Sequence, residues 1–294
     1  MTSHPGQPAP RPDVLVVNSQ VVRGAVGGRV GVFALERLGH PVWFLPTVLL
    51  PWHPGQGRAH REVMPDESFD ALVDDLARSD TLGRVDAVVT GYLGSPEQAR
   101  AIARLVKAVR EANPGMLHVC DPVSGDVNGL YVGEDTAAAI RDHLLPLADV
   151  ATPNLFELQW MSGRTIESEA EAISAARALG PARVLVTSSP ALRRNAVCNL
   201  LVGPRGTIAA EHGLVPDAPN GTGDLIAALL ASNLLAGLDD ETALHRAAAA
   251  VFELVARSVK RGARDLLTAG EQASLVQPMA LVSCRRVHEA PLRA

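Results

Sequence analysis

Hydrophobic residues fall into short unbroken runs along this chain, and longer segments with helical spacing separate them. The runs lack the polar alternation of a strand with one wet face, which indicates strands that are covered on both sides. Strands separated by helices form βαβ units, so the pattern predicts an α/β fold with a mostly parallel central sheet. The expected strands are DVLVVN (13–18), PVWFLP (41–46), VDAVVTGYL (85–93), MLHVCDP (116–122), DVATPN (149–154) and RVLVTS (183–188).

The later part of the chain changes pattern. The runs at 196–202 and 207–213 flank the turn sequence GPRG, which predicts an antiparallel hairpin. No repeat or long linker divides the chain, so one domain is expected. We predict a disordered Pro-rich tail over 1–12, a single domain over 13–270 and a tail over 271–294 whose structure the pattern leaves open. Helices are expected up to Leu38 and at 96–111, 224–236 and 241–259.

Composition excludes several classes of protein. A net charge of −5 and 3% aromatic residues argue against a nucleic-acid partner. The three cysteines are widely spaced and form no zinc motif or disulfide framework, which favours a reducing compartment. The apolar run at 225–238 is too short to span a bilayer, and the first twelve residues are a poor signal peptide. We therefore expect a cytoplasmic protein without a membrane partner.

Polar residues follow several of the predicted strands. In open α/β sheets, ligands bind beyond the carboxyl ends of the strands. The side chains at this edge are therefore candidates for binding or chemistry. They are Ser19, Gln20, Thr47, Tyr92, Asp121, Asn154, Glu157, Thr187 and Ser188.

The sequence NGTGD at 220–224 precedes an apolar helix. Gly221 and Gly223 allow a tight turn, and the helix start presents unpaired N–H groups that suit an anion. Only two lysines occur in the chain and neither lies beside these glycines, which excludes a P-loop. Asp224 would repel an anion, so it suits a general base that accepts a proton from a hydroxyl group. The alternative is a simple Asp-capped helix start.

Two further carboxylates are expected at the same edge. Asp121 ends a strand in CDPVSGD, and Glu157 lies in TPNLFEL. Carboxylates at neighbouring strand ends can hold Mg²⁺ near a triphosphate. Taken singly, each residue also fits a surface or capping carboxylate that binds no metal.

Several motifs together resemble the pyridoxal kinases of the ribokinase superfamily. GTGD (221–224) resembles the anion-hole and catalytic-Asp motif, and CDPVSGDVNGLYV (120–132) resembles the DPVMGD…LYV stretch. TPNLFEL resembles PNxxE, and TGYLGS (90–95) resembles SGYLGS. The segment from Val17 to Leu50 resembles the family's first βαβ unit, and the likeness extends from about Val14 to Ala256.

The resemblance implies a ribokinase-like three-layer α/β/α sandwich and a homodimer. It implies ATP-dependent phosphorylation of the 5′-hydroxymethyl group of pyridoxal, with Asp224 as the base. The N–H groups from Gly221 through Thr222 to Gly223 would stabilise charge on the transferred phosphoryl group. The implied cofactors are ATP and Mg²⁺, with Asp121 and Glu157 near the metal, and a requirement for K⁺ stays open.

The resemblance also assigns the remaining site residues. Ser19, Val22 and Thr47 would contact the pyridine ring, and His53 and Gly55 would lie in a segment covering the substrate. The nucleotide would be contacted by Asp121, Tyr131, Thr152, Glu157, Thr187, His212, Gly213, Leu214, Val215 and Asn220. The residues alone leave an alternative open for each of these side chains. Ser19 and Thr47 also fit capping or turn positions, His53 also fits a surface loop, and Tyr131 also fits a packing position.

Departures from the family pattern keep other functions open. Gln20 stands where relatives usually have His, and Arg23 where they usually have Tyr. Because these changes fall on the vitamin side, a hydroxymethylpyrimidine kinase or another small-alcohol kinase is the first alternative. A vitamer- or nucleotide-binding protein without catalysis is the second. A nicotinamide-binding Rossmann protein is disfavoured, because no acidic residue ends the strand after GAVGGRVG (24–31).

Overall fold

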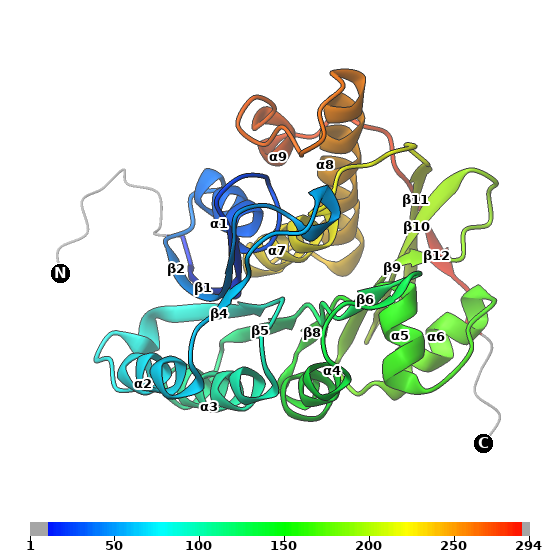
Figure 1. Ribbon diagram of the computed structural model, residues 1–294. Coiled ribbons are helices and arrows are strands. Elements are labelled where there is room, and N and C mark those ends of the chain that lie inside the picture. Colours follow the sequence, from blue (N-terminus) through cyan, green and yellow to red (C-terminus); the bar gives the residue numbers. More distant parts are fainter. Residues whose placement is uncertain (1–10, 290–294) are drawn as a thin grey trace, which may run out of the picture.

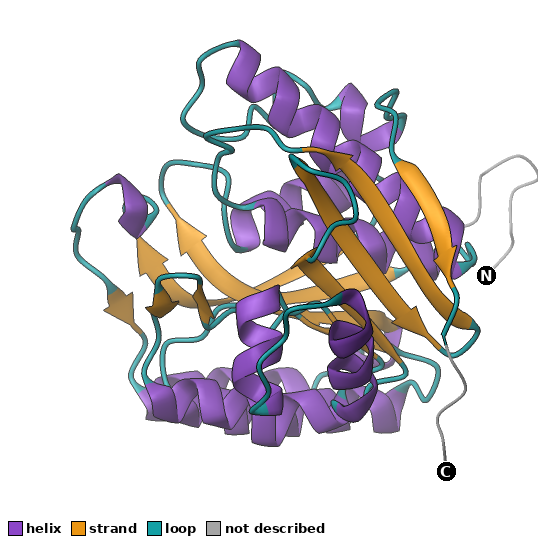
Figure 2. Ribbon diagram, turned by 90° about the vertical axis from the view of Figure 1, so that its right-hand side faces the viewer, coloured by secondary structure: helices purple, strands orange, loops and turns teal. Residues whose placement is uncertain are grey.

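A computed structural model describes residues 11–289 of the chain; the predicted tail over 1–12 lies almost entirely outside these residues. A ten-stranded sheet runs through the middle, with α1, α7 and α8 on one face and α2 to α6 on the other (Figure 1). The same layers are visible in the turned view of Figure 2. This confirms the predicted three-layer α/β/α architecture.

The strand order is β12-β11-β10-β9-β8-β5-β4-β1-β2-β3. The pairs from β2 through β9 are parallel, whereas β3 and β10 to β12 pair antiparallel with their neighbours. The strands of this sheet are β1 Asp13–Val21, β2 Val42–Leu50, β3 Glu62–Val63, β4 Val85–Thr90, β5 Leu117–Cys120, β8 Val150–Ala151, β9 Arg183–Ser189, β10 Ala196–Gly203, β11 Gly206–Gly213 and β12 Ser283–Val287. A separate small hairpin consists of β6 Gly125–Asp126 and β7 Gly129–Leu130.

The helices begin at local sequence signals. Ser95 caps α3 with Pro96 in the first turn, and Asp239 caps α8. The hairpin β10–β11 and the long helices lie close to their predicted places. The α-helices are α1 Gly28–Arg37, α2 Asp66–Ala77, α3 Pro96–Ala112, α4 Glu134–Ala139, α5 Leu155–Ser162, α6 Glu169–Ala178, α7 Thr222–Leu235, α8 Asp240–Lys260 and α9 Ala273–Val276.

Two hydrophobic cores lie on opposite faces of the sheet. In β1, Leu15 and Val17 belong to the core under α2, α3, α5 and α6, whereas Val14 and Val16 belong to the core under α1, α7 and α8. Successive side chains of a strand point to opposite faces. Because both faces are covered, the strand reads as an unbroken apolar run, as the sequence predicted.

Helix α7 has no polar face because it is enclosed on all sides. It packs against α1, α8 and the strands β4 and β5, and its residues from Leu225 to Ser232 are buried. A helix that is apolar all round belongs in a core. Its first turn is therefore held rigidly at the carboxyl edge of the parallel strands.

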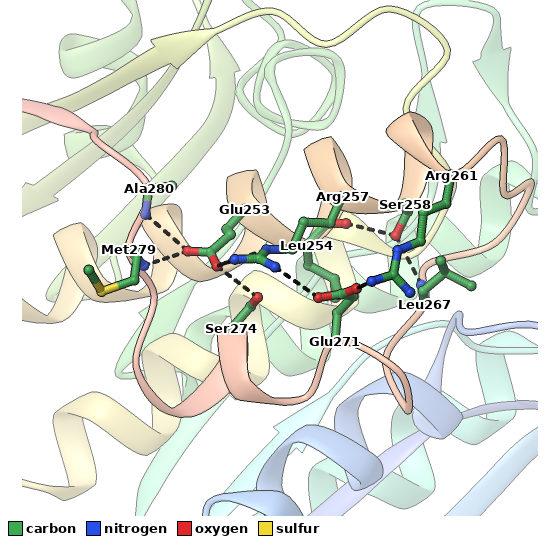
Figure 3. A network of polar contacts seen from close by, with 10 residues as sticks. All are labelled: Glu253, Leu254, Arg257, Ser258, Arg261, Leu267, Glu271, Ser274, Met279 and Ala280. Atoms are coloured by element: carbon green, nitrogen blue, oxygen red, sulfur yellow. Dashed lines mark hydrogen bonds and ion pairs between the residues drawn. The ribbon is translucent and has the colours of Figure 1, made fainter.

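The predicted C-terminal tail is ordered as far as the structure describes it. Residues 271–289 contain α9 and β12, and β12 extends the sheet beside β11. Figure 3 shows how this segment is fixed to α8: Glu253 accepts hydrogen bonds from the Met279 and Ala280 amides and from the Ser274 hydroxyl. Glu271 pairs with Arg257 of α8 and with Arg261, which follows the end of that helix. Within residues 11–289, no helix has the length and apolar character needed to cross a membrane.

Candidate active site

The start of α7 lies where the parallel strands end. Gly221 precedes the helix with φ +95°, a left-handed conformation that favours glycine. A Cβ atom at this position would lie 2.2 Å from the carbonyl oxygen of Ala25, so no larger residue fits without a backbone shift. No side chain caps the helix, and the N–H groups of Thr222 and Gly223 have no hydrogen-bond partner among the described residues. This arrangement leaves an anion-binding helix start.

Asp224 is held in a fixed orientation at the same turn. One carboxylate oxygen accepts a 2.9 Å hydrogen bond from the Asn18 side chain, and the other accepts a 2.8 Å bond from the Gly27 amide. Burial raises the pKa of Asp224 above its usual range, and the two hydrogen bonds oppose that shift. A fixed carboxylate with a raised pKa suits proton transfer near neutral pH.

Asn18 is itself fixed by the neighbouring backbone. Its side-chain oxygen accepts hydrogen bonds from the amides of Ser19, at 2.7 Å, and Tyr92, at 3.1 Å. Gly91 makes room for it, since a Cβ atom there would lie 2.2 Å from the Asn18 side-chain nitrogen. Asn18 and Gly27 are site residues that the sequence analysis did not identify.

Asp121 and Glu157 lie close enough to each other and to Asp224 for their charges to interact, but they have different environments. One oxygen of Asp121 accepts a 2.8 Å hydrogen bond from Thr152, while the other is buried without a partner. Burial raises the pKa of Asp121 well above its usual range, and the charges of Asp224 and Glu157 add to the shift. A cation beside the unpaired oxygen would relieve both effects, so Asp121 fits a metal-binding role.

Glu157 is engaged by backbone N–H groups. Its oxygens accept hydrogen bonds from the amides of Ser124 and Gly125 and, in a capping box at the start of α5, from the Asn154 amide. Burial raises the pKa of Glu157 to about 7, against the effect of these donors. The described residues contain no cluster of three or more His, Cys, Asp or Glu side chains able to hold a metal. The oxygens of Glu157 are therefore already occupied by N–H donors. We expect Glu157 to contribute negative charge near Asp121 rather than a free oxygen that binds a metal directly.

A pocket of about 240 Å³ lies between α7, α8 and the ends of β9 to β11. His212 and Phe252 stack in it with ring centroids 4.5 Å apart and an angle of 21° between the rings. Because the pocket opens beside Gly223, it can hold the base of a nucleotide whose phosphates reach the start of α7. It is lined by Thr187, Ser188, Val197, Asn199, His212, Leu214, Val215, Ala218, Thr222, Gly223, Ile226, Val251, Phe252 and Val255.

Seven of the predicted residues therefore share this pocket: Thr187, Ser188, His212, Leu214, Val215, Thr222 and Gly223. Gly213 does not line it and pairs instead with Ala196 across the β-hairpin. Phe252, Val251 and Val255 come from α8, where their spacing reads only as an apolar helix face. That pattern carries no signal for ligand binding.

The predicted vitamin side is built from β1, β2 and the following loop. Ser19 is buried, and its amide donates to the Asn18 side chain that also contacts Asp224. Thr47 is buried too. Its hydroxyl donates to the Tyr92 carbonyl at 2.6 Å, so it can only accept a hydrogen bond from a ligand. Val22 is 75% exposed, so little of its side chain is covered by the rest of the protein. The side chain is therefore free to contact the pyridine ring of a bound substrate, which is the role that the resemblance implies.

His53 and Gly55 lie in the short helical turn η1 (Pro54–Gln56) and its cap. The His53 Nδ1 atom accepts the Gly55 amide at 3.1 Å, so the proton of the neutral ring is on Nε2. Burial lowers the pKa of His53, and the nearby Asp224 charge opposes this effect. Asn220 lies close to this loop, since a Cβ atom on Gly55 would be 3.6 Å from its side-chain nitrogen. The loop thus lies within electrostatic reach of the proposed base.

Tyr131 follows the small β6–β7 hairpin and is half-exposed. Its amide donates to the Ser124 carbonyl, and burial together with the Glu157 and Asp121 charges raises the pKa of its hydroxyl. The hydroxyl therefore stays protonated at neutral pH. Tyr131 lies near the carboxylates rather than in the base pocket.

Comparisons with known proteins agree with this geometry. Residues 60–268 match the family model described as phosphomethylpyrimidine kinase. The chain is 33% identical to the pyridoxal kinase PdxY of Corynebacterium diphtheriae, covering 90% of this chain and 96% of the relative. It is 40% identical to the pyridoxine/pyridoxal/pyridoxamine kinase of Bordetella bronchiseptica, covering 89% and 95%.

Solved structures give the same result. The pyridoxal kinase of Leishmania donovani, in complex with ADP and pyridoxamine, superimposes with a TM-score of 0.86 at 28% identity over 94% of this chain and 99% of that one. The fold is shared with the Entamoeba histolytica pyridoxal kinase, with a TM-score of 0.87 and coverage of 94% and 100% at 23% identity. The family predicted from the sequence motifs is confirmed: this chain belongs to the pyridoxal kinase family of the ribokinase-like superfamily.

Proposed function

We propose that this chain phosphorylates the 5′-hydroxymethyl group of pyridoxal with ATP, giving pyridoxal 5′-phosphate and ADP. The observation that carries the proposal is the setting of Asp224. Its carboxylate is fixed by Asn18 and Gly27 in the same helical turn as the unpaired N–H groups of Thr222 and Gly223. A base and an anion site side by side are what transfer of a phosphoryl group to an alcohol requires.

The chemistry follows from these positions. The alcohol oxygen attacks the terminal phosphorus atom, the bond to the leaving ADP oxygen breaks, and Asp224 accepts the hydroxyl proton. The amides of Gly221, Thr222 and Gly223 stabilise charge on the transferred group. Because burial raises the pKa of Asp224, the carboxylate binds a proton more readily than a solvated aspartate does.

Mg²⁺ is part of the proposal. The unpaired buried oxygen of Asp121 supports a cation there, and Glu157 adds negative charge close by. When bound, Mg²⁺ would neutralise phosphate charge and orient the nucleotide. Thr152, by donating to the other Asp121 oxygen, keeps the carboxylate turned toward this position.

For the acceptor, we assign Ser19 and Thr47 to hydrogen bonds with the ring substituents, Val22 to an apolar contact, and His53 with Gly55 to the covering loop. The Bordetella relative is named for pyridoxine, pyridoxal and pyridoxamine, and a Leishmania structure holds pyridoxamine. A hydroxymethylpyrimidine is the alternative acceptor, favoured by the description of the matching family model. We further propose that the protein is a homodimer, as the family resemblance implies, and that it works in the cytoplasm, where free cysteines stay reduced.

An acceptor panel tests the proposal. The purified chain is incubated with ATP and Mg²⁺ and with pyridoxal, pyridoxine, pyridoxamine or hydroxymethylpyrimidine, and ADP release is measured with and without K⁺. We expect pyridoxal to give the highest kcat/KM. Turnover of the pyrimidine alone would select the alternative, and nucleotide binding without turnover of any alcohol would contradict a kinase. Light scattering on the same sample reports the oligomeric state.

A further inference from the structure

The nucleotide pocket contains a buried polar side chain that the protein itself does not use. Asn199 lies in β10 and is only 5% exposed, yet its side-chain amide forms no hydrogen bond within residues 11–289. The polar atoms of this amide stay accessible from the pocket, so water or a bound molecule can serve as their hydrogen-bond partner. An unused amide in the lining of a pocket therefore points to a partner that binds there.

The sheet is locally distorted opposite Asn199. In the β9–β10 pairing, Cys198 faces Ser189 and Leu200 faces Val186, so one residue of β10 stands against two of β9. This is a β-bulge, a feature that re-aims side chains beside active sites. The two β9 residues are Thr187 and Ser188, which both line the pocket, and Ser188 has φ +54°, a conformation unusual for a residue with a side chain.

The neighbouring surfaces of the pocket suit a flat aromatic ring. Val197 lies two residues from Asn199 on the same face of β10, and Val251 and Val255 approach from α8. The stacked pair His212 and Phe252 adds an aromatic wall. Burial lowers the pKa of His212, which keeps its ring neutral at pH 7. A planar base bound in the pocket would pack its faces against these apolar groups. Its polar edge would then be free to form hydrogen bonds with a side chain such as Asn199.

We propose that Asn199 is the residue that recognises the adenine edge of ATP, an assignment that rests on the proposed ATP-dependent function. An asparagine amide has a carbonyl acceptor next to an NH₂ group, so it can accept one hydrogen bond and donate another on the same side. Adenine offers a matching pair, the 6-amino donor and the adjacent ring-nitrogen acceptor. The Asn199 carbonyl accepts from the 6-amino group, and its N–H donates to the ring nitrogen. Asn199 thus determines specificity for the nucleotide and takes no part in phosphoryl transfer.

Removing the 6-amino group from the nucleotide, and the amide from residue 199 of the protein, tests this assignment. Calorimetry measures binding of ADP and of purine riboside 5′-diphosphate, in which hydrogen replaces the 6-amino group, to the wild type and to Asn199→Leu. We expect the wild type to prefer ADP about tenfold, as the loss of one buried hydrogen bond predicts. In Asn199→Leu, the preference should fall below about twofold, while kcat at saturating ATP changes little.

Val197→Ala is the matched control, because it removes an apolar part of the same wall. It should weaken both nucleotides equally and keep the preference. Should Asn199→Leu fail to fold, Asn199→Ser removes the amide with less change in polarity and should lose the preference as well. A wild type that binds both nucleotides equally, or a preference that survives in either Asn199 variant, overturns the assignment while leaving the kinase proposal intact. A wild type that binds neither nucleotide overturns both.

Discussion

The substitution Asn18→Asp tests how the structure tunes the proposed base. Asn18 donates to Asp224 at 2.9 Å and accepts from the amides of Ser19 and Tyr92. An aspartate of the same shape keeps the two acceptor contacts but loses the donor and adds a like charge. Both changes disfavour the ionised form of Asp224, so its pKa should rise further.

The size of this effect follows from the lost hydrogen bond. A hydrogen bond to a charged group stabilises by about 1.5–3 kcal/mol, and one pKa unit corresponds to about 1.36 kcal/mol. The loss alone should raise the pKa of Asp224 by about one to two units. The acid limb of the kcat profile should move up by the same amount, because the rate falls as the base is protonated.

Initial rates of ADP release between about pH 5 and 10 measure this shift. Gln20→Glu is the matched control: it makes the same amide-to-acid change two residues along β1, at a side chain that donates only to the Val21 carbonyl. Because Gln20 lies on the predicted vitamin side, the control can change the KM for the acceptor, but it should keep the acid limb of the kcat profile. If Asn18→Asp also keeps the wild-type acid limb, the Asn18 contact does not govern the protonation of Asp224.

Three further predictions concern the glycine turn, a buried histidine and the C-terminal segment. Gly221→Ala should lower both kcat and the melting temperature, since its Cβ atom would collide with backbone, whereas Gly223→Ala, which meets nothing within 4 Å, should fold normally in the same melting assay. His118 is buried and burial lowers its pKa to about 4, so the unfolded chain takes up a proton near pH 6.5 and the folded chain does not. Unfolding free energy should therefore fall by about 3 kcal/mol as pH drops from about 6.5 to 4, and denaturant titrations of His118→Gln should show a smaller fall. Glu253→Ala should leave the Met279 and Ala280 amides and the Ser274 hydroxyl without their acceptor, destabilise the fold by about 2 kcal/mol and speed hydrogen exchange in residues 271–289, and unchanged exchange there would argue against its anchoring role.

The sheet was predictable because burial on both faces leaves a direct trace in the sequence. Strand β1 contains an unbroken apolar run over 14–17, and the long helix α3 carries its own cap and periodicity. Strand β12 was not predictable, since its sequence SCRRV is polar and its strand conformation depends on pairing with distant β11. Local propensity cannot register such a partner.

Some residues of the candidate site were likewise predictable from the sequence, and others were not. Asp224 and Gly221 were recognisable from one short motif, because the turn and the base are adjacent in the chain. Asn18 was missed because it reads as part of a buried strand, and its contact with Asp224 spans 206 residues. The capping box of Glu157 was visible as Asn-x-x-Glu in TPNLFEL, but the metal interpretation did not use it.

Replacing Asp224 by asparagine tests the central claim most directly. The variant keeps the shape of the side chain and one acceptor but cannot take up the hydroxyl proton. With ATP, Mg²⁺ and pyridoxal at saturation, we predict that kcat falls by a factor on the order of 10² or more while nucleotide affinity changes little. A kcat close to that of the wild type would contradict the role of Asp224 as the base.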